Sequence, residues 1–358
     1  MAVINPENYH DDQNKQNIIK MRAVLETLPS FCKSFFRGIE PYTSTRTRLA
    51  YAYDLRLFFE YLHDKNPICA KTEITDYSIE LLDQLSRLDI EEYLEYISLY
   101  QKDGREITND ERGRSRKLST LRSFYNYFYQ SEMITNNPAA LVPLPKLHEK
   151  EIIRLEPNEV AILLDQVEDG AKLTKKELEY HKKTKIRDVA LLTLLLGTGI
   201  RVSECVGLNI SDVDFEVNGI KIRRKGGYEA VVYFGDEVET ALLDYMEQRQ
   251  HIIPSEGHED ALFLSLQNRR LAVRSVENLV KKYASRATPL KKITPHKLRS
   301  TYGTSLYRES GDIYLVADVL GHKDVNTTRK HYAAQADERR RMATKFVRLR
   351  EDVEDADS

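Results

Sequence analysis

TPHKLRSTYGTSLY at residues 294–307 is followed by VLGH at residues 319–322 and TTRKHY at residues 327–332, and these motifs decide how the chain is interpreted. In the first motif, His296 and Arg299 are spaced so that they would share one face of a helix. Thr294 and Pro295 suit the N-cap and the first turn of that helix. We therefore predict a helix that begins at Pro295 and presents an imidazole and a guanidinium side by side.

The next two motifs add a second imidazole and a phenol. Gly321 suits the end of a helix or a tight turn, which would leave His322 at a corner, and Tyr332 follows in a further predicted helix. Arginine can bind two phosphate oxygens, histidine can donate to one or move a proton, and tyrosine can form a covalent intermediate. Each motif alone is a weak signal, because a HxxR pair or a terminal tyrosine more often serves packing. Together they indicate phosphoryl transfer through a phosphotyrosine, with a second arginine from elsewhere.

The second arginine lies upstream, in DVALLTLLLGTGIRVSECVGLNISDVDF at residues 188–215. This stretch opens as a very apolar helix, breaks at Gly197-Thr198-Gly199 and resumes near Arg201. The glycines are not followed by the lysine and hydroxyl residue of a P-loop, so we predict a tight turn that aims Arg201 into a cleft. Glu204 could hold the Arg201 side chain by a charged hydrogen bond, although a surface pair of little energetic value fits the same spacing.

The ordered motifs resemble a known family. Gly-Thr-Gly-x-Arg-x-x-Glu, a lysine in a hairpin, His-x-x-Arg, Leu-Gly-His and a following tyrosine form the pattern of the tyrosine recombinases, the phage integrase family. The whole chain looks like the Xer type over roughly residues 40–350. Two positions depart from the pattern, with Ser300 where many relatives have a second histidine and Cys205 where leucine is usual. By this resemblance the catalytic residues are Arg201, Lys225, His296, Arg299, His322 and the nucleophile Tyr332.

The resemblance also implies the reaction. Tyrosine recombinases exchange DNA strands at specific sites, in the integration and excision of mobile elements or in the resolution of chromosome dimers. Tyr332 would attack a phosphate and leave a 3′-phosphotyrosyl bond and a free 5′-hydroxyl, while Lys225 would protonate the leaving oxygen. Arg201 and Arg299 would neutralise charge on the non-bridging oxygens. Because the bond energy is stored in the phosphotyrosine, we expect no metal and no cofactor.

Composition alone does not indicate a nucleic-acid-binding protein. The 358 residues include 54 Lys and Arg against 56 Asp and Glu, a formal net charge of −2, which is less basic than many DNA-binding chains. The cysteines at positions 32, 69 and 205 lack metal-binding spacing and fit a reduced, cytoplasmic protein. We recognise no secretion signal, and the longest apolar run, residues 189–196, is too short to cross a bilayer. The expected location is the cytoplasm.

The hydrophobic pattern predicts a mainly α-helical protein of two domains. By the resemblance, these are expected to be an N-terminal helical, SAM-like core-binding domain and a mixed α/β tyrosine-recombinase catalytic domain with a small β-sheet. Residues 1–20 are polar and are expected to be loosely ordered. The predicted division is an N-terminal extension at residues 1–40, the core-binding domain at 41–145, a linker at 146–153, the catalytic domain at 154–350 and an acidic tail at 351–358.

In the first domain, apolar residues between Thr43 and Leu62 recur on one helical face, and Ser119 suits the N-cap of a second helix. Residues 102–118 read as a polar turn that carries several arginines, either a solvated loop or a contact to a DNA backbone. In the resembling family this domain grips DNA. The residues expected to contact phosphates are Thr43, Ser44, Thr45, Arg46, Arg48, Arg116, Lys117 and Thr120.

In the second domain, NGIKIRRKGGYEAVVYF at residues 218–234 alternates as strand, turn and strand, with Lys225 at or beside the turn. An exposed lysine there is by default a solubilising residue, but its place between Arg201 and His296 favours catalysis. The basic helix at residues 172–185 is either solvated or an added contact. A helix at residues 274–284 could lie on DNA through Arg274, Lys281 and Lys282.

The implied partner is double-stranded DNA, on which the resembling family assembles as a homotetramer. Residues 337–350 read as a short basic helix with an apolar stripe, which needs a groove to be stable. We expect it to dock on an adjacent protomer, although docking on its own domain stays open. Three other functions fit parts of the sequence: a DNA-binding regulator that does not cleave, a type IB topoisomerase, or a helical scaffold without DNA affinity.

Overall fold

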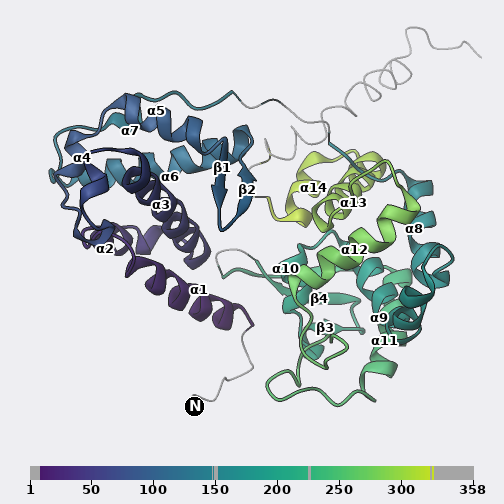
Figure 1. Ribbon diagram of the computed structural model, residues 1–358. Coiled ribbons are helices and arrows are strands. Elements are labelled where there is room, and N and C mark those ends of the chain that lie inside the picture. The colour runs from purple at the N-terminus through teal and green to yellow at the C-terminus, as the bar shows by residue number, and fades with distance from the viewer. Residues whose placement is uncertain (1–8, 147, 149–151, 225–226, 323–324, 326–358) are drawn as a thin grey trace, which may run out of the picture. The chain divides into compact units, whose positions relative to one another are not determined.

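The structure is a computed structural model that describes residues 9–146, 148, 152–224, 227–322 and 325. The chain divides into two compact units between residues 150 and 151 (Figure 1). Both are largely helical and carry only small antiparallel sheets, which confirms the predicted fold class. Within the described residues, no helix combines the length and the apolarity that a membrane span requires.

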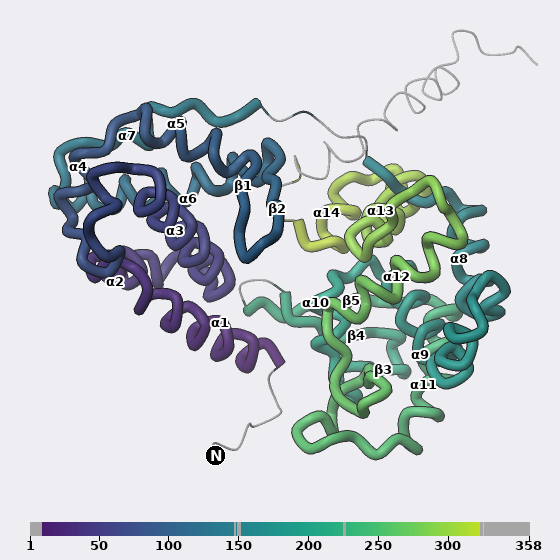
Figure 2. Tube along the Cα trace, viewed as in Figure 1, coloured from purple at the N-terminus to yellow at the C-terminus, as the bar shows by residue number. Residues whose placement is uncertain are grey.

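In its described residues, the N-terminal unit contains helices and a two-stranded hairpin (Figure 2). Strands β1 (Leu99–Lys102) and β2 (Arg105–Thr108) pair antiparallel, with Tyr100 opposite Ile107. The helices are α1 (Tyr9–Leu25), α2 (Cys32–Gly38), α3 (Thr45–Lys65), α4 (Leu81–Gln84), α5 (Arg87–Tyr96), α6 (Glu111–Gln130) and α7 (Pro138–Leu141).

Some expectations for this unit were wrong. Residues 1–20 were expected to be loosely ordered, but α1 occupies 9–25, packs against α3 and buries its apolar C-terminal end. Residues 102–118 are not a polar turn, since they form the hairpin and the start of α6. Asp110 is the N-cap of α6, and its carboxylate accepts from Gly113 N at 3.0 Å. Ser119 therefore lies inside the helix rather than at its start.

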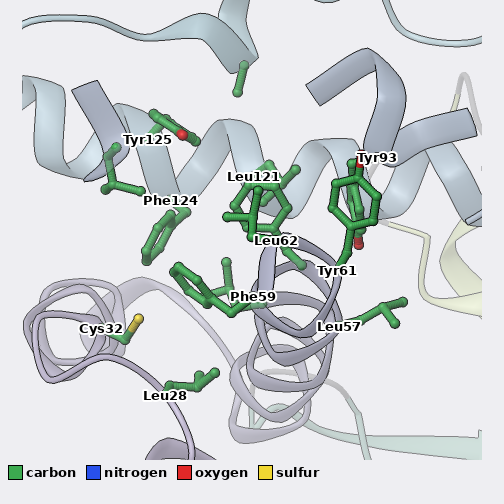
Figure 3. Packing of buried hydrophobic residues seen from close by; sticks show 14 of the residues in the cluster. Leu28, Cys32, Leu57, Phe59, Tyr61, Leu62, Tyr93, Leu121, Phe124 and Tyr125 are labelled. Atoms are coloured by element: carbon green, nitrogen blue, oxygen red, sulfur yellow. The ribbon is translucent and has the colours of Figure 1, made fainter. Parts of the chain in front are cut away.

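The core of the N-terminal unit is aromatic. Phe59 of α3, Phe124 of α6 and Cys32 of α2 lie in one buried cluster (Figure 3). Phe124 also meets the Phe35 ring edge to face, with centroids 5.1 Å apart, a favourable geometry for aromatic pairs. Helix α3 begins where Ser44 caps it by accepting from Thr47 N at 3.2 Å. The predicted apolar face of this helix is thus buried, which confirms the period that the sequence indicated.

The C-terminal unit packs helices around a three-stranded sheet of order β3-β4-β5. Its strands are β3 (Val213–Asp214), β4 (Gly219–Arg223) and β5 (Glu229–Tyr233). Its helices are α8 (Pro157–Asp169), α9 (Lys175–Thr198), α10 (Val202–Gly207), α11 (Asp236–Arg249), α12 (Val273–Ala287), α13 (Pro295–Ser310) and α14 (Ile313–Leu320). The β4–β5 hairpin was predicted, and Ile220 and Ile222 are buried on one face of it as expected.

The basic stretch at residues 172–185 and the apolar stretch that begins at Asp188 were predicted as separate segments. In the structure, both contribute to one helix, α9. It begins at a capping box in which the Thr174 hydroxyl accepts from Glu177 N and Glu177 accepts from Thr174 N at 2.9 Å. It ends at Gly199, whose φ of 63° is the left-handed conformation of a helix C-terminus. The helix therefore runs from an exposed basic end into the core and delivers the chain at Arg201.

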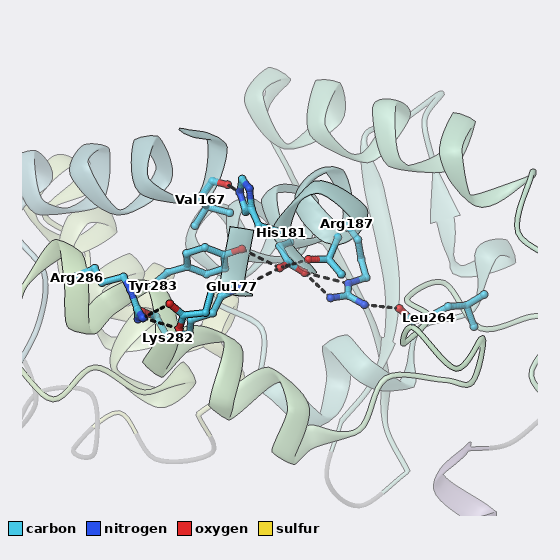
Figure 4. A network of polar contacts seen from close by, with 10 residues as sticks. Val167, Glu177, His181, Arg187, Leu264, Lys282, Tyr283 and Arg286 are labelled. Atoms are coloured by element: carbon cyan, nitrogen blue, oxygen red, sulfur yellow. Dashed lines mark hydrogen bonds and ion pairs between the residues drawn. The ribbon is translucent and has the colours of Figure 1, made fainter. Parts of the chain in front are cut away.

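A buried carboxylate ties α9 to α12. Asp188, which is 1% exposed, accepts from the Tyr283 hydroxyl at 3.0 Å and from Arg187 Nη2 at 2.6 Å (Figure 4). Arg187 in turn donates to the Leu264 carbonyl at 2.8 Å. Burial and the neighbouring Asp188 raise the pKa of the Tyr283 phenol, so the phenol stays a donor. This network therefore holds α9 in place, and Arg201 follows the C-terminal end of that helix.

Candidate active site

The turn between α9 and α10 presents Arg201. Gly199 makes the turn, and Arg201 then serves as the N-cap residue of α10. Glu204 accepts from Arg201 N at 2.7 Å and from Arg201 Nη1 at 2.7 Å. The Glu204 side chain is only 3% exposed against 35% for Arg201, so this is a buried carboxylate holding a half-exposed guanidinium rather than a surface pair. The predicted holding role of Glu204 is confirmed by this geometry.

Helix α13 supplies Arg299 to the same place. Thr294 is its N-cap and Pro295 lies in its first turn, as predicted. The Arg299 side chain is buried, and its Nη1 donates to the Gly199 carbonyl at 2.6 Å while Nη2 donates to the Leu320 carbonyl. Arg299 therefore joins three segments: its own helix, the α9 turn and the end of α14.

The end of α14 gathers both motif arginines. Gly321 ends the helix with a φ of 60°, and its carbonyl accepts from Arg201 Nη2 at 3.4 Å. The preceding carbonyl, Leu320, accepts from Arg299. The last carbonyls of a helix have no partners within it and form the negative end of its dipole, so guanidinium groups are stabilised there. Two arginines far apart in sequence are thus held on successive peptide groups.

One motif histidine lies on the helix that carries Arg299, and the other follows the end of α14, to which both arginines donate. His322 is half-buried directly after Gly321, and its backbone N–H donates to the Ala317 carbonyl at 2.9 Å, which fixes the corner that the sequence predicted. His296 is exposed one turn before Arg299 on α13. Lys225 and Tyr332 lie outside the described residues, so the structure brings together four of the six predicted catalytic positions, Arg201, His296, Arg299 and His322.

Comparison with known families matches the part of the chain that contains these motif residues. A sequence profile described as "Phage integrase family" matches residues 154–339. The chain belongs to the phage integrase family. Tyrosine recombinase XerC of Caldanaerobacter subterraneus subsp. tengcongensis is 34% identical over 297 residues, which cover 80% of this chain and 77% of that protein. Tyrosine recombinase XerD of Oceanobacillus iheyensis is 32% identical over 295 residues, covering 82% of this chain and 89% of that protein.

Solved structures show the same fold. A XerH site-specific recombinase bound to a palindromic difH substrate aligns with a TM-score of 0.61 and 20% identity, over 84% of this chain and 80% of that one. The Tn1549 transposon integrase in complex with circular intermediate DNA aligns with a TM-score of 0.61 and 20% identity, over 87% of this chain and 99% of that one. The family match and the two curated recombinases, rather than these structures, identify a Xer-type tyrosine recombinase, an enzyme that breaks and rejoins DNA at specific sites.

Several predicted DNA contacts of the first unit are engaged inside the protein. Thr120 is fully buried and donates to Asp54 at 2.9 Å, and Arg116 Nη2 donates to the same carboxylate at 2.7 Å. Buried Lys117 donates to Asn109 at 2.7 Å, and burial lowers its pKa. The prediction that Thr120 and Lys117 contact DNA phosphates is therefore wrong, because their polar groups bond to partners inside the protein rather than face the surface. Half of the Arg116 side chain remains exposed.

Near the start of α3, some of the predicted DNA contacts bond to partners inside the protein and others are exposed. Arg48 is buried and donates to Glu40 at 2.6 Å, which corrects its assignment as a surface phosphate ligand. The Thr43 hydroxyl donates to the Ile39 carbonyl at 2.6 Å, and the Thr45 hydroxyl donates to Asn14 at 2.6 Å. Ser44 and Arg46 are exposed.

On α12, the predicted contacts Arg274 and Lys281 are exposed, and Arg274 donates to Glu277 at 3.0 Å. Lys282 lies 3.8 Å from the buried Asp188 carboxylate and 3.9 Å from the centre of the Tyr283 ring. Desolvation by burial lowers its pKa, and its position in the Asp188 network is a structural one that the basic pattern of the sequence did not reveal.

Sequence analysis missed Arg224. Its Nη2 donates to the Val319 carbonyl at 2.8 Å and its Nη1 to the Asp318 carbonyl at 3.3 Å. The sequence contained no signal for this contact, because the two partners are a hairpin turn and a helix end that only the fold brings together.

Proposed function

We propose that this recombinase uses Tyr332 as the nucleophile and the Arg201–Arg299 pair as its phosphate clamp. The observation that carries the proposal is the pair of guanidiniums held on the Leu320 and Gly321 carbonyls, next to His322. A guanidinium fixed before the reaction can neutralise charge as it develops on a phosphorane without the cost of reorganisation. Arginine also offers parallel donors that match two non-bridging oxygens.

In this proposal, the Tyr332 phenol gives its proton to His296 or His322 as its oxygen bonds to phosphorus, and the bond to the 5′-oxygen breaks. Lys225 gives its proton to that leaving oxygen, and His296 and His322 donate to or exchange protons with the phosphate oxygens. The 3′-phosphotyrosyl ester keeps the bond energy, so a 5′-hydroxyl from another strand can reverse the attack and restore Tyr332. The net result is strand exchange without loss of a phosphodiester.

The partner in this proposal is double-stranded DNA of the cell's own genome, which places the enzyme in the cytoplasm. Residues 41–145 would form the core-binding domain and residues 154–350 the catalytic domain. The exposed residues of the predicted contact set, Ser44, Arg46, Arg274 and Lys281, are the strongest candidates for phosphate contacts. Assembly as a homotetramer on DNA, with the C-terminal segment exchanged between protomers, completes the proposal. Both integration or excision and chromosome-dimer resolution are compatible with it.

Replacement of the nucleophile tests the proposal. Tyr332→Phe removes only the phenolic oxygen, so we expect DNA binding to persist and the covalent adduct to disappear. The wild-type protein is incubated with fragmented genomic DNA, adducts are trapped by denaturation, and the attached DNA is sequenced to give the site. Tyr302→Phe and Tyr314→Phe serve as matched controls. A protease-sensitive adduct that persists in Tyr332→Phe would assign the nucleophile to another residue, and relaxation of any supercoiled plasmid without a preferred site would favour a topoisomerase.

A further inference from the structure

Three arginines bind the C-terminal end of α14. Arg201 and Arg299 donate to the Gly321 and Leu320 carbonyls, and Arg224 donates to the two carbonyls before them, Val319 at 2.8 Å and Asp318 at 3.3 Å. The terminal carbonyls of this helix thus accept from guanidinium groups of three separate segments. Two of these arginines form the proposed phosphate clamp, and the third has no role in it.

The backbone of Arg224 forms part of the turn that connects β4 and β5. Its N–H donates to the Tyr228 carbonyl at 2.6 Å, and its carbonyl accepts from Gly227 N at 3.1 Å. These bonds close the hairpin, so the side chain of Arg224 connects this turn to the end of α14. The contact is a tether between two elements that adjoin the reacting phosphate in the proposed site.

The C-terminal end of α14 leaves room for the Arg224 guanidinium because residue 321 is a glycine. A Cβ atom added at Gly321 would lie 1.9 Å from Arg224 Nη1 and 2.4 Å from its Cζ. The left-handed φ of 60° favours glycine at position 321, and a side chain there would in addition have to displace the end of the flexible Arg224 side chain. Arg224 Nε is buried without a hydrogen-bond partner among the described residues, a desolvation cost that the contacts of the two Nη atoms must offset.

We propose that Arg224 is a positioning residue that holds the β4–β5 turn against the end of α14 for the leaving-group step. The inference rests on the proposed function, which gives protonation of the 5′-oxygen to Lys225, the next residue in the sequence. Lys225 itself lies outside the described residues. Loss of the tether would release the turn while the phosphate clamp kept its own contacts.

The test is chemical rescue on a duplex that carries the site recovered by adduct sequencing. A 5′-bridging sulfur leaves without a proton, so it bypasses a defect in leaving-group protonation. We expect single-turnover cleavage by Arg224→Ala to fall about 10- to 100-fold on ordinary DNA, since small misplacement of a catalytic group has effects of this size. On the sulfur substrate its rate should return to within about threefold of wild type, as should that of Lys225→Ala, because neither reaction then needs the acid.

Three further variants make the result specific. Arg201→Ala should stay slow on the sulfur substrate, because its defect lies in the phosphate clamp. Arg224→Lys, which keeps one donor, should fall between wild type and Arg224→Ala. The double variant Arg224→Ala/Lys225→Ala should be no more than about threefold slower than Lys225→Ala, because residues acting on one step are not additive. Lys221→Ala, which removes a cation paired with Glu229 at 2.9 Å on the same hairpin, controls for loss of charge.

The outcomes separate the inference from the function it rests on. If wild type cleaves and Lys225→Ala is rescued, but Arg224→Ala is either as fast as wild type or not rescued, the positioning role is overturned alone. If Lys225→Ala is not rescued, the general acid is misassigned and the inference falls with it. If wild type forms no adduct with any DNA, the proposed function itself fails.

Discussion

At Gly199, one residue controls both the course of the chain and the position of the Arg201 side chain. Its φ is 63°, and an added Cβ would lie 2.4 Å from Tyr302 Cδ1 and 3.1 Å from Leu320 Cδ2. We expect Gly199→Ala to lower the stability of the C-terminal unit by more than the roughly 1–2 kcal/mol of left-handed strain alone. Gly257→Ala is the matched control, with a φ of 79° and open space around it. Urea unfolding and single-turnover cleavage measure both, and equal losses in the two variants would contradict the role of the Tyr302 contact.

Arg299 illustrates why a charge alone is not sufficient at this site. Its buried guanidinium donates through two nitrogens to the Gly199 and Leu320 carbonyls, and in the proposed function the same group also binds the phosphate. Lysine has a single ammonium and cannot keep both carbonyl contacts in the same plane. We expect Arg299→Lys to reduce cleavage by about 10²-fold or more while half-site binding changes little, because the contact matters most in the transition state. Cleavage within a few-fold of wild type would contradict the bidentate role.

The sequence could predict those contacts that are local. Glu204 lies one turn from Arg201, so their pairing follows from helical spacing alone, and Thr294, Pro295 and Gly321 follow from the chemistry of helix ends. The contacts of Arg299 and Arg224 with carbonyls of other elements could not be predicted, because backbone acceptors carry no sequence signal. Thr120 was assigned to DNA for the same reason, since its partner Asp54 lies on another helix.

At the scale of elements, the Asp188 network holds α9 against α12. Asp188 is buried and accepts from Thr184, Tyr283 and Arg187. Asp188→Ala would leave Arg187 and Lys282 as uncompensated cations, so we expect a loss of about 3–5 kcal/mol in the free energy of unfolding. Glu179→Ala on the same helix removes an exposed partner of Lys182 and should leave the urea midpoint unchanged. Equal midpoints for the two variants would show that the buried charges are compensated in another way.

Elements with an apolar period were predictable, and those held by polar contacts were not. Helices α3 and α11 and the β4–β5 hairpin follow the hydrophobic pattern of their sequences. Helix α13 was predicted instead from its Thr294-Pro295 start and the spacing of His296 and Arg299. The first turns of α6 have none, because ERGRSRK at residues 111–117 is polar and contains a glycine. Their helical form depends on the Asp110 cap and on the pairing of Arg116 with Asp54 of α3. The N-terminal part of α1 likewise lacks an apolar period, because the buried apolar residues of this helix lie only at its C-terminal end.

At the scale of the molecule, the chain divides between residues 150 and 151 into two compact units. The N-terminal unit has a core of its own, from Met21 to Val142, which includes part of the predicted N-terminal extension. The extension at residues 1–40 is thus built into the first unit from α1 onward. A sequence reading missed this because only the last turn of α1 carries buried apolar residues.

The proposed assembly on DNA concerns the whole molecule, and the segment that would carry it, residues 337–350, lies outside the described residues. Its sequence predicts a short basic helix with one apolar stripe, which requires a groove to be stable. If the groove belongs to a neighbouring protomer, successive head-to-tail contacts can close a ring. We therefore expect deletion of residues 337–358 to leave binding to one half-site intact and to abolish cooperative binding to a paired site. Deletion of the acidic residues 351–358 alone is the matched control and should keep cooperativity. Gel-shift titration and light scattering of the complexes measure the difference, and unchanged cooperativity in the longer deletion would mean that this segment docks on its own domain and that other surfaces hold the protomers together.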